Sequence, residues 1–205
     1  MDNNRLQQQF RDIAESALLS SLERSPIQFR PEHEEGAERV LFAIERARAE
    51  EAAILHSPVN RNGFLLGCLA YTEERTREHL IVGYGFRQAS TTKIEHVHHV
   101  VGGSDSVQIP PTVMQAMQDH YHKDNDNEII VFHNHPRWWL NVVFDNTPLA
   151  SPADRNVLAR VVITPQQLRR TFAKKGRLLF YLGENGFVRQ ITLPSILSLF
   201  QLVPS

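Results

Sequence analysis

The sequence predicts an α/β domain preceded by helices, and three observations support this. Apolar residues recur at helical spacing through residues 4–55, whereas short apolar runs separated by turn residues follow from residue 63. Helical and strand-like segments then alternate towards the end of the chain. With 205 residues, of which 41% are hydrophobic, the chain can bury one sizeable core.

The N-terminal part favours two helices. The first spans residues 4–24, has apolar residues from Phe10 to Leu22 on one face, and ends before Pro26. The second spans residues 31–55, where Val40 and Ile44 belong to the apolar stripe and Glu and Arg residues form the solvated face.

The sequence of residues 63–191 predicts strands and shorter helices. Strands are expected at 63–71, 79–87, 91–101 and 128–132, helices at 110–121 and 151–161, and a β-hairpin at 176–191. The strand at 128–132 is short, apolar and rich in β-branched residues, so we expect it to be buried. Cys68 is expected to be an inert core residue of the strand at 63–71.

Composition narrows the possible functions. The net charge is −1, with 22 Lys and Arg against 23 Asp and Glu, which argues against tight, sequence-independent binding to nucleic acid but does not exclude a local basic patch. One cysteine allows neither an internal disulfide nor an all-thiolate zinc site, so any metal must be held by histidine and carboxylate. No apolar run has the length of a signal peptide or a membrane helix, and we therefore expect a cytoplasmic location and no membrane partner.

The most informative motif follows the strand at 128–132. Residues i and i+2 of a strand project from the same face, so His133 and His135 can reach one point in space, and Pro136 ends the strand just beyond them. Further on, Asp154 lies in the first turn of the helix at 151–161 and can supply an oxygen ligand. Two histidines, one aspartate and a water would form an open, catalytic type of zinc site.

Each half of this motif also has an explanation without metal. Ser151-Pro152-Ala153-Asp154 is a good helix N-terminus in its own right, because the acidic residue is favourable near the helix dipole. An isolated His-x-His pair is often a surface or hydrogen-bonded pair. The order of the two halves, and the elements on which they fall, favour the metal site.

The motif His133-Asn134-His135-Pro136 followed by Ser151-Pro152-Ala153-Asp154 resembles the signature of JAMM (MPN/JAB) metalloproteases, and is closest to their RadC-like bacterial branch. The resemblance covers residues 63–162. It implies a three-layer α/β/α fold with a mixed sheet, similar to that of cytidine deaminases, at residues 59–205, with a helical extension at 1–58.

The resemblance also implies roles for individual residues. His133, His135 and Asp154 would bind Zn²⁺, Glu95 would act as general base, and Ser151 would stabilise the tetrahedral intermediate. Glu95 is not the only candidate for the base. Glu73 and Glu74 follow the strand expected at 63–71, and other JAMM branches place their glutamate on an earlier strand.

Residues 137–150 separate Pro136 from Ser151, a longer spacing than is usual in the family. This insertion is apolar and contains both tryptophans, Trp138 and Trp139. One interpretation is a flap in which these residues bind substrate or a partner, because buried aromatics dominate interface energetics. The other is a hydrophobic lobe that packs on its own domain.

The function expected from the resemblance is a zinc-dependent metallopeptidase or isopeptidase acting on a protein substrate, with a ubiquitin-like conjugate or precursor as the candidate class. Two alternatives remain. One is a RadC-like accessory protein of DNA metabolism or mobile elements with little proteolysis; the other is a non-catalytic MPN-type scaffold. Fold-level analogy does not choose between them.

Overall fold

The structure is a computed structural model that describes residues 27–73, 75–103, 107–134, 176–184 and 187–191. The helices expected at 4–24 and 151–161 lie outside these residues. Within them, a six-stranded sheet has the order β1-β3-β2-β4-β5-β6. The strands are β1 (Ala53–Asn60), β2 (His79–Gln88), β3 (Thr91–Val101), β4 (Asn127–Asn134), β5 (Arg177–Glu184) and β6 (Phe187–Ile191). Only β4 and β5 pair in parallel among them, so the sheet is mixed.

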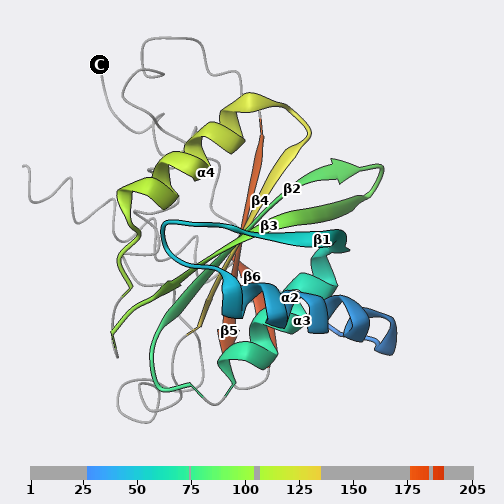
Figure 1. Ribbon diagram of the computed structural model, residues 1–205. Helices are drawn as coiled ribbons and strands as arrows, with labels where there is room; N and C mark the ends of the chain where they lie inside the picture. Colours follow the sequence, from blue (N-terminus) through green and yellow to red (C-terminus); the bar gives the residue numbers. More distant parts are fainter. Residues whose placement is uncertain (1–26, 74, 104–106, 135–175, 185–186, 192–205) are drawn as a thin grey trace, which may run out of the picture.

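Helices cover both faces of this sheet (Figure 1). A short 3-10 helix, η1 (Pro31–His33), leads into α2 (Glu34–Arg46), which packs with α3 (Arg61–Thr72) on one face. Helix α4 (Pro111–Lys123) packs on the other. The predicted α/β class with a mixed sheet is therefore confirmed.

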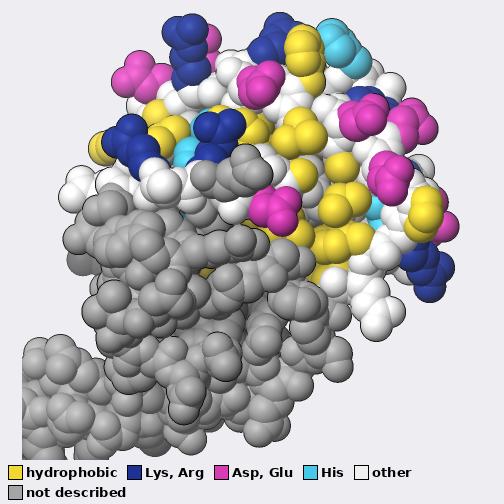
Figure 2. All heavy atoms as spheres, turned by 90° about the horizontal axis from the view of Figure 1, so that it is seen from below, with side chains coloured by type: hydrophobic (Ala, Val, Ile, Leu, Met, Phe, Trp, Pro, Cys, Tyr) yellow, Lys and Arg dark blue, Asp and Glu magenta, His cyan; other side chains and the backbone are white. Residues whose placement is uncertain are grey.

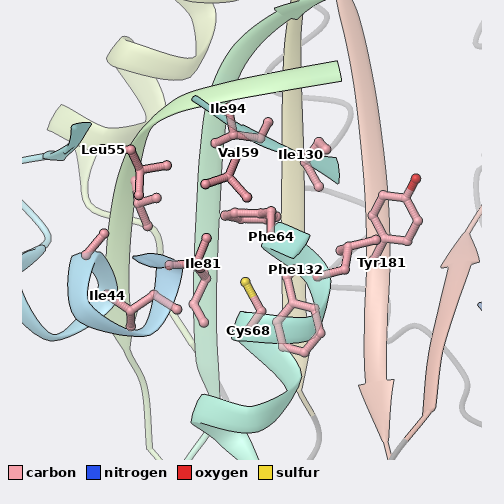
Figure 3. Packing of buried hydrophobic residues seen from close by; sticks show 14 of the residues in the cluster. Ile44, Leu55, Val59, Phe64, Cys68, Ile81, Ile94, Ile130, Phe132 and Tyr181 are labelled. Carbon is pink, nitrogen blue, oxygen red and sulfur yellow. The ribbon is translucent and has the colours of Figure 1, made fainter. Parts of the chain in front are cut away.

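The larger core cluster lies between the sheet and the helices α2 and α3 (Figure 3). The ring of Phe64 from α3 lies at its centre and is fully buried. An ideal Cβ placed on Gly83 of β2 would be 2.9 Å from that ring. Glycine at this position therefore lets the helix approach the sheet closely.

The strand expected at 63–71 is wrong, because these residues belong to α3. The side chain of Asn60 caps this helix by accepting a hydrogen bond from the amide of Gly63, at 2.8 Å. Helix α3 contacts α2 as well as the sheet, so apolar residues occur around much of its surface, and a short continuous apolar run does not distinguish helix from strand. Cys68 is buried as expected, but in a helix, and burial raises the pKa of its thiol.

The long helix expected at 31–55 is also wrong in its second half. Helix α2 ends at Arg46, since Ala47 adopts extended backbone angles, and β1 begins at Ala53. Strand β1 pairs with β3 at the edge of the sheet and spans residue 58, where a domain boundary was expected. Helix α2 and strand β1 share one core with the rest of the sheet.

The other predicted elements that fall within the described residues agree with the structure. The strands at 79–87, 91–101 and 128–132 correspond to β2, β3 and β4, and the helix at 110–121 corresponds to α4. Strands β5 and β6 form the expected antiparallel hairpin, with pairing as far as Glu184 and Phe187.

Acidic and basic side chains are mixed on the face seen in Figure 2, with hydrophobic side chains between them. None of the described helices is long and apolar enough to cross a membrane.

Candidate functional site

His133 lies near the end of β4 and is only 1% exposed. Its partner across the sheet is Leu80 of β2. The ring Nδ1 lies 3.1 Å from the carbonyl oxygen of His79, and because a carbonyl can only accept, Nδ1 must be the donor. In the neutral ring the lone pair is then on Nε2, the tautomer that a histidine needs in order to bind a metal through Nε2.

The residue that faces Nε2 of His133 is Glu78. Its Oε2 lies 3.7 Å from that nitrogen, and the residue is only 6% exposed. Glu78 directly precedes β2, so the pairing of β2 with β4 brings its carboxylate to the histidine. Glu78 was not among the residues predicted from the sequence. The available signal was a glutamate just before the strand predicted at 79–87, combined with the pairing of that strand with the histidine strand.

The structure does not bring Glu95 to His133. Glu95 is the extra residue of a bulge in β3, between the pairs Gly85–Ile94 and Tyr84–His96. These pairs lie at least four residues further along β2 than Leu80, the partner of His133. At roughly 3.3 Å per residue this is about 13 Å along the strand, and β2 also lies between β3 and β4.

Two other glutamates, Glu73 and Glu74, were candidates for the general base. Glu73 is exposed at the C-terminal end of α3, and Glu74 lies outside the described residues.

Several further predicted site residues also lie outside the described part of the chain. They are the metal ligands His135 and Asp154, the oxyanion residue Ser151, and the substrate residues Trp138 and Trp139. Within the ranges that the structure describes, no group of three or more His, Cys, Asp or Glu side chains is placed to hold a metal ion. His133 is therefore the only predicted metal ligand whose surroundings can be described.

Two further histidines, in the neighbouring strands β2 and β3, form a buried pair. Nδ1 of His79 lies 2.8 Å from Nε2 of His99, the rings stack, and the ring of Tyr71 packs edge-on against both. Burial is the main cause that lowers the pKa of each histidine to about 4, and the nearby Arg75 also lowers both. The pair is therefore neutral at neutral pH.

The described part of the candidate site offers two side chains with possible chemical roles. It supplies a buried imidazole whose tautomer is fixed by a backbone carbonyl, and a buried carboxylate that can accept a proton. No family model, no curated protein and no solved structure matches this chain.

Proposed function

We propose that this protein is a zinc-dependent metallopeptidase or isopeptidase of the JAMM type, with Glu78 as its general base. The observation that supports this most strongly is the buried Glu78 carboxylate 3.7 Å from Nε2 of His133, the first histidine of the metal motif. The finer part of the fold, a JAMM domain similar to the cytidine deaminases, belongs to the same proposal.

In this proposal His133, His135 and Asp154 hold the zinc ion. The chain has a single cysteine, which is buried in α3, so a ligand set of two histidines and one carboxylate agrees with its composition. When bound, zinc lowers the pKa of a coordinated water to about 7 and polarises a carbonyl group.

Glu78 would accept a proton from the attacking water and later donate it to the nitrogen of the leaving amine. In this proposal Glu78 lies beside the metal but is not one of its ligands; its Oε2 lies 3.7 Å from Nε2 of His133. Burial of both side chains limits competition from bulk water, and the His79 carbonyl keeps the imidazole in one orientation throughout. Ser151 would donate to the oxyanion that develops on the substrate.

The proposed substrate is a peptide or isopeptide bond in a protein, and a ubiquitin-like conjugate or precursor is the class to test first. Trp138 and Trp139 are proposed to contact it.

The test compares two glutamates on neighbouring strands. Purified wild type, Glu78→Gln and Glu95→Gln are incubated with a linear ubiquitin-like fusion protein, and cleavage is followed with time. We expect Glu78→Gln to lower kcat by on the order of 100-fold or more, because the general base is lost, and Glu95→Gln to remain near wild type.

Zinc content is measured on the same samples by elemental analysis, with His135→Ala as a control for ligand loss. Zinc should be retained in both glutamine variants and lost in His135→Ala. A larger loss of kcat in Glu95→Gln than in Glu78→Gln would overturn the assignment of the base. A wild type that contains no zinc would favour the scaffold, and salt-dependent DNA binding would favour the accessory protein.

A further inference from the structure

The side chain of Asn134, the residue between the two motif histidines, connects β4 to the segment that contains Glu78. Its Oδ1 accepts a hydrogen bond from the amide of His79 at 2.6 Å, and its Nδ2 donates to the carbonyl of Arg77 at 3.3 Å. The two bonds therefore hold the residues on either side of Glu78. Asn134 itself is only 4% exposed.

These two hydrogen bonds continue the contact between β2 and β4 beyond the last backbone pair of the two strands. The last backbone pair between β2 and β4 joins Leu80 to His133, and β4 ends at Asn134. The Asn134 side chain takes the place of the next stretch of strand, because an amide offers both an acceptor and a donor in one plane. An aliphatic residue would leave the buried amide of His79 without this acceptor. Buried amides without a hydrogen-bond partner are rare in folded proteins, because they cost free energy.

The opposite side of the same segment is also fixed. The amide of Glu78 donates to the carbonyl of Gly103 at 2.9 Å, and its carbonyl accepts from the amide of Gly102 at 2.8 Å. Glu78 thus lies between backbone bonds to Gly102 and Gly103 and the side-chain bonds of Asn134. With its backbone held on both sides, the Glu78 carboxylate keeps its place beside His133.

We propose that Asn134 is a positioning residue that holds Glu78 in place for proton transfer. This proposal rests on the proposed function for its kinetic consequence, but its structural part stands without it. A catalytic carboxylate displaced by about 1 Å can cost on the order of 100-fold in rate, so a residue that fixes the backbone around Glu78 affects turnover without touching substrate.

The first experiment uses metal-free, full-length protein and needs no activity. Amide hydrogen exchange is compared in wild type, Asn134→Ala, Asn134→Asp and Asn127→Ala. Asn127 is the matched control, because its Nδ2 also bonds a backbone carbonyl, that of His120, at the other end of β4. We expect exchange of the His79 amide to accelerate at least tenfold in Asn134→Ala alone, since Asn134→Asp keeps an oxygen acceptor for that amide. Unchanged His79 exchange in Asn134→Ala would overturn the proposal.

The second experiment measures kinetics with the fusion substrate. Asn134→Ala should lower kcat by 10- to 100-fold with KM and zinc content near wild type, and should have little further effect in the Glu78→Gln background. Equal losses in both backgrounds, or parallel loss of zinc, would show a merely structural role and overturn the proposal. If wild type binds no zinc but His79 exchange still responds to Asn134→Ala, the proposed function fails while the structural role of Asn134 stands.

Discussion

A buried histidine, His98, and a half-buried one, His120, lie between the sheet and α4. Nδ1 of His98 lies 3.0 Å from the hydroxyl of Tyr84, and Nε2 of His120 donates to the carbonyl of Gly85 at 2.7 Å. Burial is the main cause that lowers the pKa of both histidines below the ordinary value of 6.5, and for His98 the neighbouring His96 adds to it. Both are therefore neutral in the folded protein at neutral pH.

We expect this cluster to destabilise the fold in acid. The unfolded chain takes up protons on these histidines near pH 6.5, whereas the folded protein does so only at lower pH. The contribution of these neutral histidines to the free energy of unfolding is therefore fully present above pH 6.5 and declines as the pH falls below it. His98→Gln should weaken this dependence, measured as the change in the midpoint of urea unfolding between pH 7.5 and 5.5. His56→Gln, at an exposed position in β1, is the control. Equal dependence in wild type and His98→Gln would contradict the expectation.

At the residue scale, the sequence predicted His133 but not its carboxylate partner. A local pattern, two histidines two residues apart at the end of a predicted strand, led to the prediction of His133 as a metal ligand. The partner of His133 depends on the strand register, which juxtaposes residues 55 positions apart in sequence and leaves Glu95 in a bulge further along the sheet. No local pattern contains that register.

At the element scale, the contact between α2 and α3 depends on Gly67. An ideal Cβ on this residue would lie 2.8 Å from the carbonyl oxygen of Ala37 and 2.8 Å from the Cβ of Val40, both in α2. These atoms belong to or adjoin the backbone, so they cannot move aside without separating the helices.

Gly67→Ala should lower the free energy of unfolding by about 1–3 kcal/mol, as overpacking commonly does. The matched control is Gly36→Ala, also in a helix, where the nearest atom is Cγ1 of Val59 at 3.0 Å. Replacing glycine by alanine also raises helix propensity, by about 1 kcal/mol, in both variants. The difference between their free energies of unfolding therefore reports the contact between α2 and α3. Urea unfolding measures it, and a Gly67→Ala variant as stable as Gly36→Ala would show that the helices have room to separate.

Sequence reasoning predicted best the elements that have clear end signals or alternating apolar and polar residues. Strands β2 and β3 and helix α4, which begins at a Pro-Pro pair, correspond closely to the predicted ranges. Helix α3 was mistaken for a strand because its apolar run is short and continuous. Strand β1 was missed because it contains His56 and Pro58 and only two of its residues, Leu55 and Val59, are buried. Its pairing with β3, rather than its own pattern, identifies it.

At the scale of the whole molecule, the sheet order explains how the candidate site is assembled. Strand β2 lies between β3 and β4, so the chain just before β2 can contact the end of β4 on one side and the end of β3 on the other. Glu78 occupies this position, with Gly102 and Gly103 on one side and His133 and Asn134 on the other. Residues from three distant parts of the sequence meet there, at an end of the sheet.

Zinc affinity is the sharpest test of the proposal that His133 binds a metal ion beside Glu78. Metal-free wild type, His133→Ala and His56→Ala are titrated with zinc in competition with a chromogenic chelator. We predict about one tightly bound zinc per chain in wild type and in His56→Ala, and at least about 100-fold weaker binding in His133→Ala, since even residues that only orient a ligand are worth 10- to 100-fold. Equal zinc affinity in wild type and His133→Ala would show that His133 is not a metal ligand.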